Sequence, residues 1–248
     1  MRAMSEPRVV AVIPVRYAST RLPGKPLATI DGRPMVQHVW ERTRVAPGVA
    51  RTIVATDDER IAAAARAFGA EVAMTGAHAT GTDRLAEVAE RLDADVVLNV
   101  QGDLPLVDPA ALAACAASFR ADPGLGMASL MTPIRDQREF TSPHVVKVVT
   151  AGDGTALYFS RSPIPYWRGP CPDGVLGWRH IGLYGYRRAV LLALAAAPRG
   201  RLERAEELEQ LRALARGVRI RMIEVDSAPP EVDTAEDLDR VRRLLQGG

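Results

Sequence analysis

Short apolar runs alternate with segments of helical periodicity in the first hundred residues of the chain. Residues 9–13 form a continuous apolar run that ends at Pro14, which is typical of a strand buried on both faces of a sheet. Proline and glycine residues then exclude a long regular element over residues 15–31. Pro34 suits the first turn of a helix whose apolar stripe covers residues 35–40. The pattern predicts a first βα unit.

The same alternation recurs up to residue 100. The next predicted elements are a strand at 52–55, a helix at 61–68, a strand at 71–74, a helix with its apolar face at 85–92, and a strand at 95–100. Thr56 and Glu59 form a predicted capping box for the first of these helices. Alternating strands and helices predict an α/β fold with a doubly wound, mostly parallel, Rossmann-like sheet. In such folds, ligands bind beyond the carboxyl ends of the strands.

Strand-like runs dominate the chain after about residue 126. They cover residues 127–132, 145–150, 156–160 and 181–186, and two helices are then predicted at 201–215 and 235–245 around a strand at 218–225. We expect a small antiparallel extension at about 126–190 that closes over the site. The chain contains no repeat or proline/serine-rich linker, so residues 1–248 are predicted to form a single domain.

Composition and charge exclude several classes of function. The formal net charge of +2, from 32 basic and 30 acidic residues, gives no long-range attraction for nucleic acid. The longest apolar run, residues 189–197, is too short to span a bilayer, and residues 1–8 are too polar for a secretory signal. We therefore expect a cytoplasmic protein without a nucleic-acid or membrane partner. Cys115 and Cys171 have no CxxC spacing and are predicted to be free thiols.

Three cations lie within ten residues directly after the first predicted strand: Arg16, Arg21 and Lys25. A triphosphate gains negative charge during phosphoryl transfer. This charge is stabilised by arginine guanidinium groups, which can donate two hydrogen bonds, by a lysine ammonium and by loop amides. A solvated basic loop is an equal alternative from these residues alone. The loop is not a P-loop, because Ser19 and Pro26 stand where that motif has its first glycine and its Ser/Thr.

Two aspartates and the start of one helix are further candidates. Asp103 follows the strand predicted at 95–100 and is expected at the carboxyl edge, facing the basic loop, although it could be an ordinary turn residue. Asp233 taken by itself is more typical of a helix N-cap. Gly81 and Thr82 offer backbone amides at a helix start, which suits phosphate, whereas Arg84 could be merely a surface charge.

An ordered series of motifs then covers almost the whole chain. Residues 12–27 contain IPVRYASTRLPGKPL, and the later motifs are VATDDERI at 54–61, GTDRLAEV at 81–88, NVQGD at 99–103, VKVV at 146–149, ALYFSRSPIP from 156, HIGLYGYR from 180, LEQLR from 208 and VDTAEDL from 232. In this order the chain resembles the 3-deoxy-manno-octulosonate cytidylyltransferases, or CMP-Kdo synthetases.

The resemblance implies an enzyme that transfers CMP from CTP to the anomeric hydroxyl of 3-deoxy-D-manno-octulosonate (Kdo). Attack on the α-phosphorus would release pyrophosphate and give CMP-Kdo, a precursor for lipopolysaccharide biosynthesis. The implied fold is that of the nucleotide-diphospho-sugar transferases, and the implied partners are CTP and a small sugar acid. The resemblance also implies Mg²⁺ held by Asp103 and Asp233, and a homodimer built through the antiparallel extension.

The resemblance also implies roles for individual residues. The implied catalytic residues are Arg16, Arg21, Lys25, Asp103 and Asp233. The implied CTP-binding residues are Arg16, Ser19, Arg21, Lys25, Gly81, Thr82, Arg84 and Gln101. The implied sugar-acid residues are Arg161, His180, Tyr184, Glu209 and Gln210. Arginine can fork onto a carboxylate, and the other side chains can bond to hydroxyls.

One departure from the family pattern allows more than one acceptor substrate. The family usually has an acidic residue directly after the aspartate of QGD, and this chain has Leu104 there. Another sugar acid, such as an amino or other Kdo analogue or a sialic acid, is therefore an alternative acceptor. A metal-dependent glycosyltransferase and a noncatalytic nucleotide-binding protein are alternatives from other classes. His38, His78 and His144 lack metal-ligand spacing and are given no catalytic role.

Overall fold

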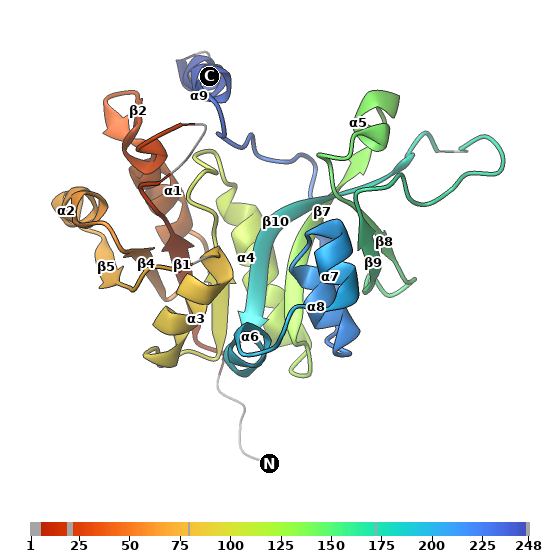
Figure 1. The fold of residues 1–248 in the computed structure, drawn as a ribbon, viewed down its shortest axis with the longest axis horizontal. Coiled ribbons are helices and arrows are strands. Elements are labelled where there is room, and N and C mark those ends of the chain that lie inside the picture. Colours follow the sequence, from red (N-terminus) through yellow and green to blue (C-terminus); the bar gives the residue numbers. More distant parts are fainter. Residues whose placement is uncertain (1–5, 19–21, 79, 172, 247–248) are drawn as a thin grey trace.

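The computed structural model describes residues 6–18, 22–78, 80–171 and 173–246. Its described residues form a nine-stranded sheet in which seven strands lie in one row. In spatial order these strands are β11 (Ile220–Glu224), β7 (Met127–Ile134), β10 (Gly177–Arg187), β6 (Val96–Asn99), β1 (Val9–Pro14), β4 (Arg51–Thr56) and β5 (Glu71–Met74). Figure 1 shows this row running across the molecule. The predicted α/β sheet is confirmed.

Strand β1 lies at the centre because it buries both of its faces. Val10 and Val12 join one core cluster, whereas Ala11 and Ile13 join the other. Its neighbours β4 and β6 both run parallel to it. A strand with two buried faces has no polar face, which is why its sequence is a continuous apolar run.

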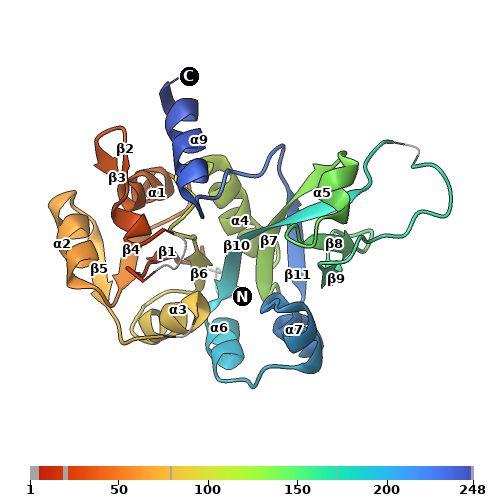
Figure 2. The ribbon, with the colours of Figure 1, turned by 45° about the horizontal axis from the view of Figure 1, so that its top comes forward.

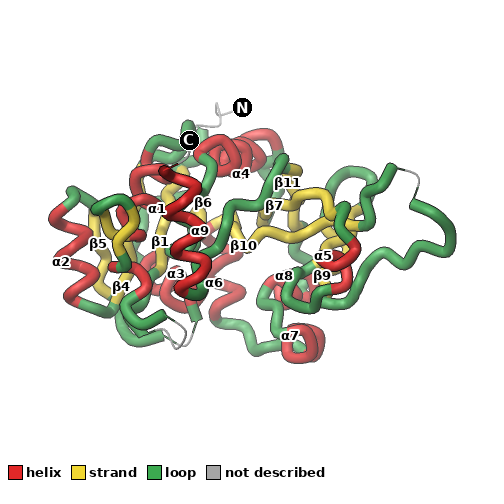
Figure 3. The backbone as a smooth tube through the Cα atoms, turned by 90° about the horizontal axis from the view of Figure 1, so that it is seen from above, coloured by secondary structure: helices red, strands yellow, loops and turns green. Residues whose placement is uncertain are grey.

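Helices cover both faces of the sheet. On one face lie α1 (Met35–Arg44), α2 (Glu59–Ala67) and α4 (Pro109–Ala121). On the other face lie α3 (Gly81–Glu90), α6 (Arg188–Ala195) and α8 (Gln210–Ala215). Figure 3 shows α4 and α6 on opposite sides of the strands. Among the described residues, no helix is long and apolar enough to cross a membrane.

The predicted antiparallel extension is only partly separate from the main sheet. β10 is inserted antiparallel between β6 and β7, and it bends at an irregularity between Ile181 and Tyr184. Its first part pairs with β7 and also with β8 (Lys147–Thr150), which in turn pairs with β9 (Ala156–Ser160). The short helix α5 (Gln137–Thr141) lies beside this part of the molecule (Figure 1). Thus β7 and β10 belong to the main sheet, and β8 and β9 extend it.

Two local predictions are wrong in detail. Helix α2 is capped by Asp58, whose carboxylate accepts from the amide of Arg60 at 2.9 Å, because Thr56 is still the last residue of β4. The helix predicted at 201–215 is two helices, α7 (Arg201–Glu206) and α8, separated by Glu207 at φ 53°. Each break has a local cause, since a side chain caps one helix and a left-handed residue ends another.

The end of the chain returns to its beginning. Helix α9 (Ala235–Gln246) packs its Leu238 and Val241 with Ile30 and Met35 in a third core cluster. Ile30 belongs to the small hairpin of β2 (Thr29–Ile30) and β3 (Arg33–Pro34), and Figure 2 shows α9 beside it. This packing brings the segment before α9 to the carboxyl edge of the sheet.

Candidate active site

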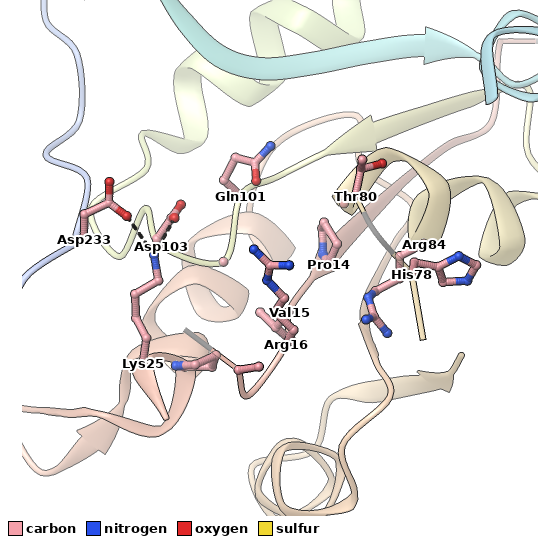
Figure 4. A pocket seen from close by; sticks show the side chains of 14 residues that line it. Pro14, Val15, Arg16, Lys25, His78, Thr80, Arg84, Gln101, Asp103 and Asp233 are labelled. Atoms are coloured by element: carbon pink, nitrogen blue, oxygen red, sulfur yellow. Dashed lines mark hydrogen bonds and ion pairs between the residues drawn. The ribbon is translucent and has the colours of Figure 1, made fainter. Parts of the chain in front are cut away.

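A cleft of about 660 Å³ lies at the carboxyl ends of β1 and β6. The loop after β1 forms one wall through Arg16 and Lys25, and the loop after β6 forms another through Gln101 and Asp103 (Figure 4). The segment before α9 adds Asp233. A cleft beyond the carboxyl ends of parallel strands is the expected ligand site of this architecture.

Lys25 bridges two carboxylates at one end of the cleft. Its ammonium Nζ lies 2.8 Å from Asp103 Oδ2 and 3.2 Å from Asp233 Oδ1 (Figure 4). Burial by itself lowers the pKa of Lys25, but the charges and hydrogen bonds of the two aspartates outweigh it, so the net pKa is raised. The structure thus brings three of the predicted catalytic residues into direct contact.

The backbone conformation after β1 sets the position of the Lys25 main chain. Lys25 opens a short 3₁₀ helix, Lys25–Leu27, directly after Gly24 at φ 69°. The amide of Gly24 donates to Tyr17 O at 3.2 Å, and a β-carbon on Gly24 would lie 3.1 Å from the Tyr17 hydroxyl. A left-handed residue packed against a ring favours glycine, because it has no β-carbon.

Asp233 lies two residues before the first residue of α9. The cap of α9 is formed by Thr234 and Asp237, whose carboxylate accepts from the amides of Asp233 and Thr234 at 3.1 and 2.9 Å. The Asp233 carboxylate can therefore reach Lys25. A backbone hydrogen bond from Val232 N to Asp103 O at 3.0 Å holds the two aspartate segments side by side.

The loop after β6 packs tightly against the loop after β1. A β-carbon on Gly102 would lie 2.2 Å from Val15 Cγ1 and 3.3 Å from Pro14 O. Gln101 lines the cleft, and its amide nitrogen donates to Gly182 O at 3.4 Å. Only glycine allows this approach, which places Asp103 next to Lys25.

The residues predicted to bind CTP fall into three groups. Arg16, Gly81 and Arg84 line the cleft together with Gln101 and Lys25. Ser19 and Arg21, also predicted to bind CTP, lie outside the described residues. Thr82 is directed to another partner, since its hydroxyl donates to the Glu209 carboxylate.

Arg84 is held in place by the segment before α3. Its side chain is 3% exposed, and its Nη2 lies 3.1 Å from Asp57 Oδ2. Its Nη1 donates to Gly76 O at 3.3 Å. Arg84 is therefore no ordinary surface charge: it lines the cleft and ties α3 to the ends of β4 and β5. Asp57 was not among the predicted site residues, although it belongs to the VATDDERI motif.

His78 is a cleft residue that the sequence interpretation passed over. It lines the cleft, and its Nε2 lies 2.6 Å from Glu87 Oε2. Glu87 also accepts from the amide of Gly76 at 2.9 Å, and its pKa is lowered first by the bond to His78 and then by the bond to Gly76. This contact holds the segment that leads to Thr80, the N-cap of α3. His78 was given no predicted role because it lacks metal-ligand spacing. That criterion says nothing about whether a histidine lines a cleft.

Four of the five predicted sugar-acid residues lie around the middle of β10. The Tyr184 hydroxyl donates to Gln210 Oε1 at 3.1 Å, and Gln210 Nε2 lies 3.5 Å from His180 Nδ1. Glu209 precedes Gln210 and contacts Thr82. Among the described residues that line the cleft, none belongs to this set of five. Glu209 connects its group to the first turn of α3 through Thr82.

His180 is enclosed by packing. Its Nε2 lies 2.9 Å from Ser129 Oγ, and its ring stacks edge-on against Phe159 with centroids 4.9 Å apart. Burial lowers the pKa of His180 to about 3 and raises the pKa of Tyr184. Both side chains are therefore neutral at ordinary pH and can act only through hydrogen bonds.

Arg161 lies apart from this group, on the extension after β9. Its Nε donates to Glu206 O at 2.7 Å, and its Nη1 donates to Pro143 O at 3.0 Å. Beneath it, buried Lys147 donates to the carbonyls of Ser142, Val145 and Arg161. Lys147 belongs to the VKVV motif and supports the backbone of Arg161.

Leu104 points away from the cleft. Its side chain is 2% exposed and belongs to the core cluster that includes Val107. Its amide donates to Gln101 O at 3.3 Å, which closes the turn that presents Asp103. The leucine at this position therefore contributes to packing behind the carboxylate.

Known proteins share both sequence and structure with this chain. The cytidylyltransferase family model matches residues 10–220. The 3-deoxy-manno-octulosonate cytidylyltransferase of Geobacter metallireducens is 53% identical, and the alignment covers 96% of this chain and 98% of that protein. The protein of the same name from Syntrophotalea carbinolica is 52% identical over 96% of this chain and 99% of its own.

Solved structures give the same result. A CMP:2-keto-3-deoxy-manno-octonic acid synthetase complexed with CTP superposes with a TM-score of 0.93 at 45% identity, covering 97% of this chain and 99% of the other. A 4-diphosphocytidyl-2C-methyl-D-erythritol synthase from Anaerococcus prevotii has a TM-score of 0.67 at 13% identity over 97% of each chain, which shows a shared fold alone. The predicted family is confirmed: the chain belongs to the 3-deoxy-manno-octulosonate cytidylyltransferases.

Proposed function

We propose that this chain transfers CMP from CTP to the anomeric hydroxyl of Kdo, releasing pyrophosphate and forming CMP-Kdo. The observation that carries the proposal is the contact of Lys25 with Asp103 and Asp233 at one end of the cleft. Cations and carboxylates placed together are what nucleotidyl transfer requires. The names of the relatives and the CTP complex of a similar structure support the choice of substrates.

The donor set of Asp103 and Asp233 fits Mg²⁺. The two carboxylates already share one cation, the Lys25 ammonium, and Mg²⁺ prefers one or two carboxylates together with phosphate oxygens and water. No cluster of three or more His, Cys, Asp or Glu side chains suited to a metal occurs among the described residues. When bound, Mg²⁺ would lower the pKa of the attacking hydroxyl and neutralise phosphate charge.

The residues of the chain bind and orient the nucleotide. Arg16 and Lys25 supply positive charge toward the phosphates, and Ser19 and Arg21 are proposed to join them from the same loop. Gly81 at the start of α3 supplies a backbone amide at the positive end of a ten-residue helix. Gln101 and Arg84 complete the nucleotide side of the cleft.

The acceptor is proposed to lie between the cleft and the middle of β10. Tyr184, Gln210 and neutral His180 offer hydrogen-bonding groups for hydroxyls, and Glu209 lies next to them. Arg161 offers a guanidinium for the acceptor's carboxylate. The attacking hydroxyl would then approach the α-phosphorus from the side opposite the leaving pyrophosphate.

The decisive assay is pyrophosphate release from each of the four nucleoside triphosphates with Kdo and Mg²⁺. Release with CTP alone is expected. An amino analogue of Kdo and a sialic acid are tested beside Kdo, and turnover with one of these instead would replace Kdo as the acceptor.

Asp103→Asn should lower kcat by about a thousandfold or more while the circular dichroism spectrum stays unchanged. Near-normal turnover by this variant would contradict the catalytic assignment.

The oligomer is proposed to be a homodimer built through the extension. Leu157 is 61% exposed on β9, and Tyr166 is 86% exposed in the loop between β9 and β10, which projects from the body (Figure 1). Exposed large apolar side chains on a projecting segment suit a protein interface. Light scattering should give the mass of two chains, and Leu157→Asp with Tyr166→Asp should halve it. The cytoplasm is the proposed location.

A further inference from the structure

The ammonium of Lys25 occupies the place between the two carboxylates. Its distances of 2.8 Å to Asp103 Oδ2 and 3.2 Å to Asp233 Oδ1 make it a shared cation of this pair. Its side chain is 15% exposed, so bulk water cannot easily replace it. Its positive charge offsets the repulsion between the two partly buried carboxylates.

The segments that carry the two carboxylates are joined by contacts that do not involve Lys25. The Val232–Asp103 backbone bond and the Thr234–Asp237 cap hold their segments in place. The backbone of Lys25 is positioned by Gly24 and the 3₁₀ helix, and its four-carbon stem can turn if the ammonium leaves the aspartates. A cation on a flexible stem thus lies between two carboxylates whose segments are joined to each other.

A divalent cation on these carboxylates would need the same position. Two cations cannot share it, because their repulsion in a partly buried site is strong. The remainder of the cleft, which Arg16 also lines, offers the ammonium an alternative place next to phosphate oxygens once a nucleotide is bound.

We propose that Lys25 is a placeholder cation: it neutralises Asp103 and Asp233 in the free protein and leaves them for the phosphates when a divalent cation binds. This inference rests on the proposed function, because it takes the two aspartates as the metal ligands. It implies that Lys25 weakens metal binding in the absence of nucleotide. By reciprocity, CTP then strengthens metal binding by the same factor as the metal strengthens CTP binding.

The test measures Mn²⁺ binding, by the loss of the free-ion electron paramagnetic resonance signal, with and without CTP. Without CTP, Lys25→Met should bind Mn²⁺ about tenfold more tightly than the wild type, which is a typical coupling between two sites. Lys25→Arg keeps the charge and should stay close to the wild type. Arg16→Met is the matched control: it removes another cation that lines the same cleft, and should change Mn²⁺ affinity by about twofold at most.

Two results separate failure of this inference from failure of the metal site. Unchanged or weaker Mn²⁺ binding by Lys25→Met, with binding that still depends on Asp103, would overturn the placeholder role and leave the metal site intact. Mn²⁺ binding by Lys25→Met that is insensitive to Asp103→Asn and Asp233→Asn would instead contradict the metal site itself. Circular dichroism of every variant identifies any that fails to fold, and Lys25→Gln then replaces Lys25→Met.

Discussion

The Thr82 hydroxyl donates a hydrogen bond to the Glu209 carboxylate, which joins two segments 127 residues apart in the sequence. Thr82 lies in the first turn of α3, and Glu209 directly precedes α8. The first belongs to the proposed nucleotide side and the second to the proposed acceptor side. The two halves of the site therefore meet through a charge-assisted hydrogen bond.

Removing this contact should impair acceptor binding. Thr82→Val keeps the volume of the side chain but leaves Glu209 without its donor, so the start of α8 loses a constraint. We expect the KM for the sugar acid to rise about fivefold, which corresponds to about 1 kcal/mol for one hydrogen bond. Thr82→Ser keeps the hydroxyl and should remain close to the wild type.

A double-mutant cycle with Glu209→Gln measures the contact itself. The coupling between Thr82→Val and Glu209→Gln in kcat/KM should be about 1 kcal/mol. Strictly additive effects would mean that the two residues act separately, which would contradict a link between the two halves of the site.

The sequence predicts those parts of the fold that depend on local periodicity. β1 and α3 appear where expected because burial on two faces and on one face leave different apolar patterns. The break between α7 and α8 leaves no such pattern. It depends on Glu207 at φ 53° and on Glu206, whose carboxylate accepts from Ser160 Oγ at 2.7 Å, a partner 46 residues away.

The sequence predicts those parts of the site that follow directly from a strand, and misses those that depend on packing between distant segments. The strand before Asp103 places this residue at the carboxyl edge, which elementary sheet geometry predicts. Asp233 was identified only by resemblance, because its approach to Lys25 depends on packing between segments 208 residues apart. The insertion of β10 between β6 and β7 likewise depends on tertiary pairing, and so does the burial of His180.

Gly102 should tolerate no side chain. The β-carbon of Gly102→Ala would lie 2.2 Å from Val15 Cγ1, so the two loops must separate and Asp103 must shift relative to Lys25. We expect a loss of about 1–3 kcal/mol in the free energy of unfolding, as for other overpacked sites. We also expect kcat/KM to fall by about a hundredfold, because catalysis is sensitive to displacements of about 1 Å.

A compensating change tests the cause of this loss. Adding Val15→Ala to Gly102→Ala removes the clashing methyl group and should restore part of the stability and of kcat/KM, as measured by urea unfolding and pyrophosphate release. Gly152→Ala is the control, since its β-carbon would meet no atom within 4 Å. Equal effects of Gly102→Ala and Gly152→Ala would contradict a steric explanation.

Restoring an acidic residue at position 104 should reduce stability without changing acceptor choice. Leu104 is buried in the core, so Leu104→Glu would place a carboxylate among apolar side chains. We expect the free energy of unfolding to fall by about 3 kcal/mol, and the ratio of kcat/KM for Kdo to that for a sialic acid to stay unchanged. Leu104→Met preserves the volume and should cost about 1 kcal/mol or less. A changed acceptor preference with full stability would mean that this side chain reaches the substrate.

His180 should make the protein sensitive to acid. Burial lowers the pKa of His180 from 6.5 to about 3 in the folded state, whereas the unfolded chain takes up the proton near the ordinary value. Above about pH 6.5 neither state is protonated at this residue, so it contributes no pH dependence. Below that pH only the unfolded state gains the proton, and stability is lost as the pH falls toward 3. The loss should reach about 2 kcal/mol near pH 5.

The contribution of His180 can be isolated by substitution. His180→Gln keeps a hydrogen-bonding side chain beside Ser129 but cannot take up the proton. The decrease in the urea midpoint between about pH 7 and about pH 5 should therefore be smaller in this variant than in the wild type. His144→Gln, at an exposed histidine, should retain the wild-type decrease. If His180→Gln is as sensitive to acid as the wild type, the buried imidazole accepts its proton without unfolding. His180 could then not be the strictly neutral hydrogen-bonding group that the proposed acceptor site requires.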